Sequence, residues 1–301
     1  MRHRTAPSWS IGILVILTVL AIVTPAVATP PRIVFSRNGD LFTILPDGTG
    51  LRRVSDSPAR EQAPAWSPDH RRIAFVSWDR RIVVMDADGS HRRLLFRVPS
   101  WYGSVGSLAW SPDGRRIAFS TTRFTGSPRA TRDCGQIWWM RSDGRDAHRV
   151  VWHEPHITGI AWSPDGSWLA AGFEHQNMTV ACGDDRPLGI AVVHPDGSGL
   201  RGLGVRFGTD PDWSPDGRWI VYRDRRRTCH ICGQLWLIQP DGTHGHALVP
   251  TPASEGGYRW PRYAPGGARI AAIGDGLWLF RSSDGLRLRN VVTRSVASFD
   301  W

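Results

Sequence analysis

Lysine is absent from this chain of 301 residues, in which all 37 basic residues are arginine. They outnumber the 27 acidic residues and give a formal net charge of +10. Codon bias explains such a preference without any functional cause. The functional alternative is a surface attracted to anionic envelope polymer or lipid headgroups, through runs such as Arg225-Arg226-Arg227.

Familiar catalytic motifs are also missing. The chain has no Gly-x-Ser-x-Gly elbow, no Walker loop and no dinucleotide fingerprint. The sequence His153-Glu154-Pro155-His156 has the wrong spacing for the metalloprotease motif His-Glu-x-x-His, and its proline would interrupt the required helix. We therefore expect a protein that is not an enzyme and that needs no cofactor.

Long apolar runs are confined to the N-terminus. A basic start is followed by an apolar run over residues 11–23 and by Ala26-Val27-Ala28, which is the layout of a secretory signal peptide. The run is shorter than the ~20 residues that span a bilayer, although flanking residues could lengthen it into an uncleaved anchor. We expect residues 1–28 to be a signal peptide or such an anchor, and residues 29–301 to be one exported domain. Export argues against a nucleic-acid partner.

What the chain does contain is a repeat. An aromatic residue, a small residue, proline and a turn residue recur at intervals of 44, 52, 51 and 50 residues. The aromatic residues that open the five copies, called anchors here, are Trp66, Trp110, Trp162, Trp213 and Tyr263. These intervals suit a four-stranded unit better than a helical repeat, so a β-propeller is predicted.

Each unit has two tight turns. The first follows the anchor and leads into a short apolar run, and the second is an Asp-Gly turn such as Asp88-Gly89 or Asp143-Gly144. If the strands of a unit are A, B, C and D, the A-to-B and C-to-D turns share one end of the molecule, called here the turn face. The B-to-C and D-to-A connections share the opposite end, called the variable face.

The two ends of the chain supply a sixth unit. Residues 32–36, 41–45 and 51–54 are expected to form strands B, C and D, while residues 296–301 resemble a strand A that ends on Trp301. We therefore predict an all-β, six-bladed propeller of four-stranded antiparallel blades. The C-terminal strand would join the N-terminal blade and close the ring, which removes exposed sheet edges.

The phrases WSPDGRRIAF and WSPDGRWIVY, with the later Pro-Asp-Gly turns, resemble the WD40-like repeats of the TolB propeller family. The resemblance covers residues 32–301 and implies protein interaction in the cell envelope. TolB itself carries an α/β domain before its propeller, and strand patterns here begin at Arg32, so we expect that domain to be missing. No binding residue can be transferred from the family.

Four cysteines fall in predicted connections of the variable face. An even number in an exported chain favours disulfides, and we favour Cys229 with Cys232 and Cys134 with Cys182. The alternative is a zinc or copper site, since thiolates and imidazoles suit both metals. Its candidate ligands are Cys229, Cys232, His153, His156 and His175.

Aromatic and histidine side chains in the same connections are candidates for recognition. Trp101 and Tyr102, between Pro99 and Gly103, are the strongest, because large aromatic residues in loops are typical interface anchors. They could equally fold back and cap the blades. The remaining candidates are Trp152, Tyr258, His153, His156 and His175.

These patterns predict an exported, monomeric, non-catalytic propeller that is periplasmic, envelope-associated or extracellular. It would bind a protein, a peptide or an anionic envelope polymer through its variable face and central channel, and would meet a membrane only through an uncleaved N-terminal segment. The alternative is a metal-dependent hydrolase or lyase with a Cys/His site at the channel mouth. A purely structural envelope scaffold is the third option.

Overall fold

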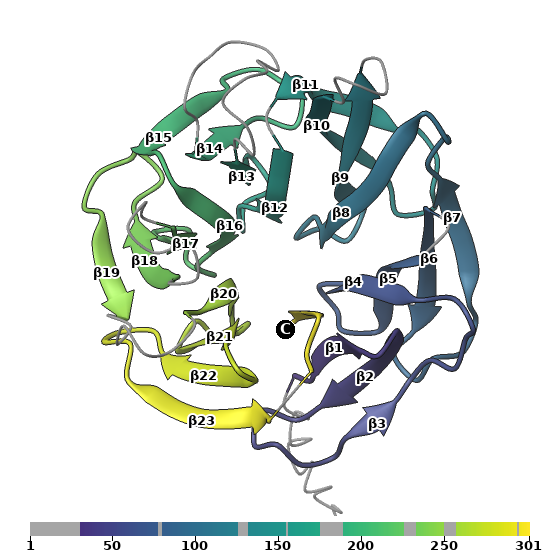
Figure 1. The fold of residues 1–301 in the computed structure, drawn as a ribbon, viewed down its shortest axis with the longest axis horizontal. Helices are drawn as coiled ribbons and strands as arrows, with labels where there is room; N and C mark the ends of the chain where they lie inside the picture. The colour runs from purple at the N-terminus through teal and green to yellow at the C-terminus, as the bar shows by residue number, and fades with distance from the viewer. Residues whose placement is uncertain are drawn as a thin grey trace, which may run out of the picture.

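Six four-stranded antiparallel sheets surround a central axis in the computed structural model (Figure 1). It describes residues 31–77, 80–125, 132–154, 156–174, 189–225, 233–249, 257–293 and 295–301. These residues contain strands and turns but no helix, and therefore no helix that could cross a membrane. The predicted all-β, six-bladed propeller is confirmed.

In every blade the strands follow one another from the axis to the rim. Blade 1 consists of β24 (Ser298–Asp300), β1 (Ile33–Arg37), β2 (Asp40–Ile44) and β3 (Arg52–Arg53). Blade 2 consists of β4 (Glu61–Trp66), β5 (Arg72–Ser77), β6 (Arg81–Asp86) and β7 (Arg93–Arg97). Blade 3 consists of β8 (Tyr102–Trp110), β9 (Arg116–Thr125), β10 (Arg132–Arg141) and β11 (His148–Glu154).

The other three blades repeat the pattern. Blade 4 consists of β12 (His156–Trp162), β13 (Leu169–Glu174), β14 (Gly189–Val193) and β15 (Arg201–Val205). Blade 5 consists of β16 (Gly208–Trp213), β17 (Ile220–Asp224), β18 (Gln234–Ile238) and β19 (His246–Val249). Blade 6 consists of β20 (Arg259–Tyr263), β21 (Arg269–Ile273), β22 (Leu277–Arg281) and β23 (Arg287–Val292).

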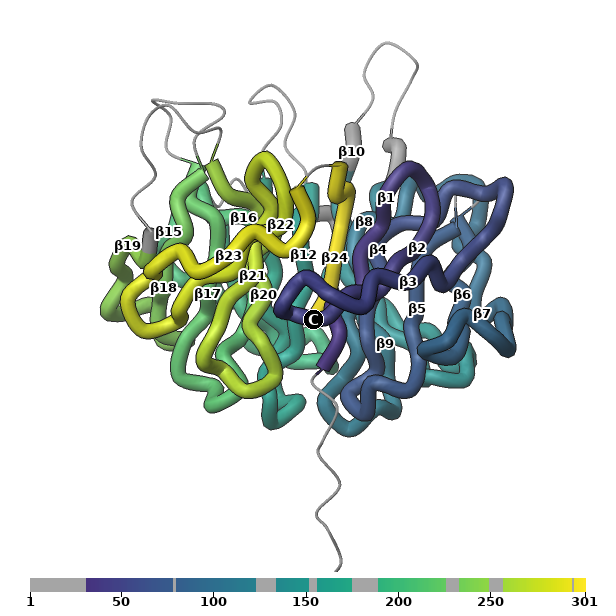
Figure 2. Tube along the Cα trace, turned by 90° about the horizontal axis from the view of Figure 1, so that it is seen from below, coloured from purple at the N-terminus to yellow at the C-terminus, as the bar shows by residue number. Residues whose placement is uncertain are grey.

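The ring closes as the sequence predicts. Strand β24 pairs antiparallel with β1, placing Phe299 opposite Phe35, and the hydroxyls of Ser36 and Ser298 lie 2.8 Å apart. Figure 2 shows β24 between β20 of blade 6 and β4 of blade 2. All the described strands, including the pair that closes the ring, belong to residues 31–301.

The anchor aromatic residues are buried between neighbouring blades. Each is at most 8% exposed, and Trp301 takes the anchor position in blade 1. The indole N–H of Trp110 donates to the carbonyl of Ala65 in the preceding blade at 3.2 Å, and Trp162 donates in the same way to Ala109 at 3.2 Å. A buried aromatic side chain thus links each pair of blades. In Trp110 and Trp162 the indole N–H group also has a hydrogen-bond partner.

In blades 2 to 5 the turns after the anchors share one hydrogen-bond pattern. In blade 3, the hydroxyl of Ser111 donates to Asp113 at 2.6 Å and accepts the backbone N–H of Arg116 at 2.9 Å. The fourth position of this turn has a positive φ, supplied by glycine at Gly114 (φ 67°). Blade 2 differs because His70 takes that position with φ 53°, which brings an imidazole to the turn face.

Replacing Phe299 with alanine tests the closure. Phe299 is 4% exposed and packs in a cluster built from blades 6 and 1. We expect the substitution to lower the free energy of unfolding by about 3 to 5 kcal/mol, since it leaves a cavity where the ring closes. Urea denaturation measures this. Phe207→Ala is the control: Phe207 is 40% exposed, so its loss should cost about 0.5 kcal/mol or less. Equal effects of both substitutions would contradict the closure argument.

Candidate functional site

The innermost strands of the six blades line the central channel (Figure 1). The residue just before the anchor is alanine in blades 2, 3 and 4. In blades 5, 6 and 1, which follow one another around the ring, it is Asp212, Arg262 and Asp300. Half of the channel wall is therefore apolar at this level, while the other half carries two acids and one base, called here the channel triad.

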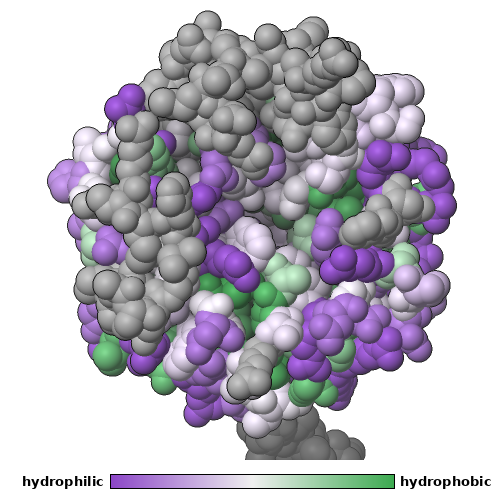
Figure 3. Space-filling model, viewed as in Figure 1, coloured by the Kyte–Doolittle hydropathy of each residue, from purple (hydrophilic) through white to green (hydrophobic). Residues whose placement is uncertain are grey.

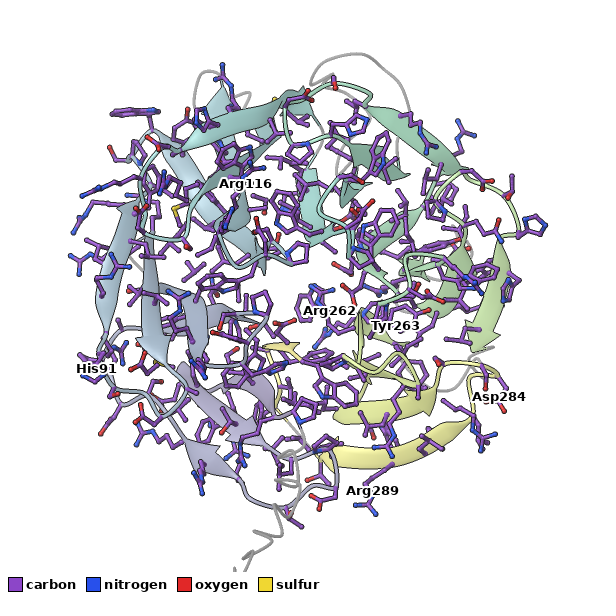
Figure 4. The ribbon with its side chains drawn as sticks, turned by 180° about the vertical axis from the view of Figure 1, so that it is seen from behind. His91, Arg116, Arg262, Tyr263, Asp284 and Arg289 are labelled. Atoms are coloured by element: carbon purple, nitrogen blue, oxygen red, sulfur yellow. The ribbon has the colours of Figure 1, made fainter. Side chains whose placement is uncertain are left out.

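The triad lies at the end of the channel nearest the turn face, because its members sit one residue before the anchors that lead into that face. Figure 4 views the molecule from the turn face and shows Arg262 near its centre, next to Tyr263 on the same strand. Arg262 Nε is 3.9 Å from Asp300 Oδ1, and the Arg262 side chain is only 13% exposed.

Each acid of the triad also holds the next blade. Asp300 Oδ2 accepts the backbone N–H of Trp66 at 2.7 Å, which ties blade 1 to blade 2. Asp212 Oδ2 accepts the backbone N–H of Tyr263 at 2.7 Å, which ties blade 5 to blade 6. The two carboxylates thus make the same contact at equivalent positions, and in both cases the contact is a charge-assisted hydrogen bond to an anchor.

Burial shifts the titration of the triad. Desolvation raises the pKa of Asp212 to about 7, although the guanidinium of Arg262 and the N–H of Tyr263 favour the ionised form; the Asp300 charge adds to the increase. Desolvation also raises the pKa of Asp300, against the lowering effect of Arg262. Asp212 can therefore gain or lose a proton near neutral pH, a property that is concentrated at functional sites.

A second buried acid lies two residues before Asp212. Asp210 is 4% exposed, has φ 56° and stands at a register irregularity between β16 and β17. Its Oδ2 accepts the hydroxyl of Thr209 at 3.1 Å, and its N–H donates to the hydroxyl of Thr158 at 3.1 Å. Desolvation raises its pKa, and Arg223 and Arg262 act in the opposite direction.

Arg223 extends the network towards the variable face. It lies on β17, and its buried Nε has no hydrogen-bond partner among the described residues. Desolvation lowers its pKa, while the charge of Asp210 raises it. The channel wall of blades 5 and 6 thus contains acidic and basic side chains that attract each other. Their burial costs free energy because the charged groups lose their water.

His70 adds an imidazole near the turn-face end of the triad. Its ring packs on Trp66 with centroids 5.4 Å apart, and its buried Nδ1 has no hydrogen-bond partner within the described ranges. Burial lowers its pKa, whereas Asp300 and Asp69 raise it, so the neutral imidazole is favoured at pH 7.

The channel groups can bind and exchange protons, and they can orient a polar or cationic group through Asp212 and Asp300. Within the described part of the chain, no three His, Cys, Asp or Glu side chains converge closely enough to hold a metal ion. This arrangement was not predicted. An alignment of the six repeats on their anchors would have found it, since only Asp212, Arg262 and Asp300 replace alanine before the anchor.

The predicted recognition residues have different positions. Trp101 is the most exposed large apolar residue described, at 66%, and lies on the variable face where blade 2 connects to blade 3. Tyr102 is partly buried: its ring lies 6.3 Å from Trp101 and edge-on to Trp138 at 5.8 Å. Trp138 in turn stacks on Phe119 in the core, so Trp101 is the exposed end of an aromatic row fixed in blade 3.

Tyr258 is buried, in contrast to Trp101. It is 4% exposed and packs edge-on against Phe280 at 4.8 Å, and its hydroxyl accepts a hydrogen bond from Arg287 at 3.4 Å. This position matches the alternative in which the aromatic side chain folds back and caps the blades, and a role of Tyr258 in recognition stays a prediction. Tyr258 is buried because it lies just before β20, where the chain enters the apolar cluster between blades 5 and 6.

Several predicted residues cannot be placed. Trp152 and His153 belong to β11, but their side chains are not described, and His156 opens β12 in a partly buried position. The positions outside the described residues are His175, Cys182, Cys229 and Cys232. Cys134 is buried on β10 and is not a free thiol. Its pairing with Cys182, and the alternative metal site, stay predictions.

Figure 3 shows the variable face, which is hollowed at its centre, with hydrophilic (purple) and hydrophobic (green) side chains on the visible walls. The hollow lies over the ends of the innermost strands where the channel opens. Trp101 on the variable face and the channel triad near the turn face are therefore two separate candidate sites at opposite ends of the molecule.

The chain belongs to the TolB beta propeller domain family, whose model matches residues 47–267. This finding confirms the family resemblance noted in the repeats. It also agrees with the fold, because the matched stretch runs from the C-to-D turn of blade 1 to the A-to-B turn of blade 6.

Solved structures share the architecture at low identity. TolB from Acinetobacter baumannii is 20% identical with a TM-score of 0.67, covering 90% of this chain and 66% of its own. Putative TolB from Agrobacterium tumefaciens is 18% identical with a TM-score of 0.65, covering 88% and 89%. An oligogalacturonate lyase in complex with manganese is 14% identical with a TM-score of 0.59, covering 83% and 70%.

A curated relative matches over a short segment. Dipeptidyl-peptidase 5 from Porphyromonas gingivalis is 47% identical over 38 residues, which are 13% of this chain and 6% of that protein. The chain thus spans slightly less than two thirds of the first TolB structure and a small fraction of the peptidase. At these identities the structural matches show a shared fold, and the fold occurs in both binding proteins and enzymes.

Asp212→Asn tests the titration of the channel triad. Because the folded pKa of Asp212 is about 7 and an unfolded aspartate titrates near pH 3.9, its contribution to stability is present below pH 4 and is lost as pH rises towards 7. We expect the stability of the natural chain to fall, relative to the variant, by about 2 kcal/mol between pH 5 and pH 8.

Denaturant titrations across this range measure the difference. Asp216→Asn is the matched control, because hydrogen bonds from Ser214 and Arg218 lower the pKa of Asp216. Its titration therefore lies below this range, and its effect on stability should not change between pH 5 and pH 8. If the difference between the natural chain and Asp212→Asn is equally independent of pH, the assigned titration is wrong.

Arg262→Leu tests the charge balance. Without the guanidinium, the acids of the triad face each other uncompensated, so we expect a loss of about 3 to 5 kcal/mol at pH 8. The loss should shrink at pH 5, below the pKa of about 7 at which Asp212 titrates, because Asp212 is then protonated. Thermal unfolding at both pH values is the measurement. Arg218→Leu, which changes an exposed side chain, should alter the stability little. An equal loss for Arg262→Leu at both pH values would contradict the proposed charge balance.

Proposed function

We propose that this chain is an exported binding protein that recognises a protein or peptide in the cell envelope through its variable face and channel, without catalysing a reaction. The observation that carries the proposal is Trp101, a large aromatic side chain that is 66% exposed on a rigid support. Folding gains little from leaving such a side chain in water, whereas interfaces are enriched in tryptophan.

The contacts around Trp101 make it suitable as a central residue of a binding interface. Its neighbour Tyr102 contacts Trp138 on β10, and the Arg80 guanidinium donates to the carbonyl of Tyr102 at 3.4 Å. The side chain is therefore presented on a held backbone, so a partner would not have to order it from a mobile loop. Phe207, 40% exposed between blades 4 and 5, offers a second apolar contact on the same face.

Family membership supports the same function. The TolB beta propeller domain covers most of the chain, and the resemblance to TolB implies interaction with proteins of the cell envelope. The N-terminal basic and apolar pattern is that of an exported protein. The triad adds a polar, pH-sensitive end to the channel, which suits a polar or cationic chain end that enters from the variable face.

The alternative is a metal-dependent hydrolase or lyase that uses Cys229, Cys232, His153, His156 and His175. Metal analysis and thiol titration on one natively purified sample separate the two. The binding function predicts no stoichiometric metal and no free thiol, with the cysteines paired as Cys134 with Cys182 and Cys229 with Cys232. Stoichiometric zinc, copper or manganese would favour the enzyme.

Trp101→Ala tests the binding function. A central tryptophan at an interface contributes about 2 kcal/mol or more, so we expect the affinity for the captured partner to fall by about 30-fold, while the unfolding midpoint stays unchanged. A photo-crosslinking residue introduced at position 101 in living cells should yield a discrete adduct, which identifies the partner for the affinity measurement.

Leu94 is the matched control position, since it is 48% exposed but lies on the outer strand of blade 2, away from the variable face. A crosslinker there should give no such adduct, and Leu94→Ala should bind the partner normally. Unchanged affinity of Trp101→Ala, with adducts at position 94 in place of position 101, would reject the variable face as the binding surface.

A further inference from the structure

Among the described residues, the exposed leucines lie along one arc of the rim. Six large apolar side chains of the described residues are at least 40% exposed, and two of them are Trp101 and Phe207. The other four are on or next to the outermost strands of blades 6, 1 and 2: Leu286, Leu288, Leu51 and Leu94. Among the side chains that are described on the outer strands of blades 3 to 5, none is comparably exposed.

This arc is a continuous surface. The Arg289 guanidinium on β23 donates to the carbonyl of Asp47 in the C-to-D turn of blade 1. The corresponding turn of blade 2 lies so close to Val54, the residue after β3, that a Cβ added to Gly89 would meet the Val54 carbonyl. Figures 1 and 2 both show β23 and β3 following each other along the rim. We call β23, β3, β7 and the preceding Leu51 and Leu286 the rim arc.

Arginine accompanies leucine throughout the rim arc. The three strands carry six arginines and no acidic residue: Arg52, Arg53, Arg93, Arg97, Arg287 and Arg289. Figure 4 shows Arg289 projecting from the edge of the molecule. Among the described residues, Arg52 and Arg93 form no ion pair, and the nearby Asp47 and Asp88 accept hydrogen bonds within their own turns from Thr49 and Ser90.

The described chain begins in blade 1, the middle blade of this arc. Arg32 precedes β1, and its guanidinium donates to the carbonyl of Gly50, the neighbour of Leu51. Residues 24–31 separate Arg32 from the apolar run over residues 11–23. A linker of that length spans at most ~29 Å, so the apolar run is tethered close to the rim arc wherever it is retained.

We propose that the rim arc docks on an anionic phospholipid surface. Interfacial binding combines apolar side chains that enter the headgroup boundary with arginines attracted to negative lipids, and the arc presents both. A hydrated anionic polymer would engage the arginines but gain nothing from the four leucines. A second copy of the chain would bring arginine-rich strands of like charge against each other.

Docking in this way would orient the molecule. The leucines sit at or just after the C-to-D turns, so the contact is made by the turn-face side of blades 6, 1 and 2. The variable face, with Trp101, would then point away from the lipid and remain open to a partner. This inference does not depend on the binding function proposed for that face.

The test uses residues 31–301, which contain all described strands and the ring closure, so that the apolar N-terminal run cannot anchor the protein by itself. Sedimentation with vesicles of phosphatidylcholine alone, or with one third phosphatidylglycerol, measures partitioning. We expect binding only to the anionic vesicles, weakening as salt rises. Arg52→Glu should weaken it by at least ~5-fold and Leu51→Ser by at least ~3-fold, with unfolding midpoints unchanged.

Matched controls lie on other parts of the molecule. Arg145→Glu changes an exposed arginine in the C-to-D turn of blade 3, and Phe207→Ser changes an exposed apolar residue on the variable face; both should bind vesicles normally. Three results would overturn the proposal: no binding to anionic vesicles, binding that soluble polyphosphate abolishes while Leu51→Ser has no effect, or a dimer in solution that Arg52→Glu dissociates.

Discussion

The structure depends on burying one aromatic side chain between each pair of adjacent blades. A single four-stranded blade has two apolar faces and cannot bury either alone, so each anchor is useful only when the next blade covers it. The indole N–H groups of Trp110 and Trp162, which donate to the preceding blade, add direction to this packing. The ring must therefore close, and β24 closes it by pairing with β1.

The channel triad includes a residue of the blade in which the ring closes. Asp212, Arg262 and Asp300 replace the alanine before the anchor in blades 5, 6 and 1, and blade 1 is the one in which the last strand pairs with the first. Each of the two carboxylates accepts a hydrogen bond from the backbone of the anchor in the next blade. The acids therefore stabilise the contact between blades and also line the channel. An apolar side chain would avoid the dehydration cost, and the retained charge leaves the channel with a proton that is exchangeable near pH 7.

Much of the fold could be predicted because turn residues and anchors define the repeat, and both are recognisable from short stretches of sequence. Ring closure followed from counting strands at both ends of the chain. The site was harder. Trp101 and Tyr258 both look like loop aromatics in the sequence, yet one is exposed and the other lies against Phe280. The channel triad was missed because its members are about 50 and 40 residues apart in sequence order and meet only through the ring symmetry.

The proposed binding function requires that partners meet the variable face, which leaves the turn face for other contacts. Hydrogen–deuterium exchange of the chain with and without its captured partner tests this directly. We expect slower exchange at the start of β8, beside Trp101, and at the entry to β16 beside Phe207, with no change in the turns after the anchors. Protection confined to those turns would contradict it.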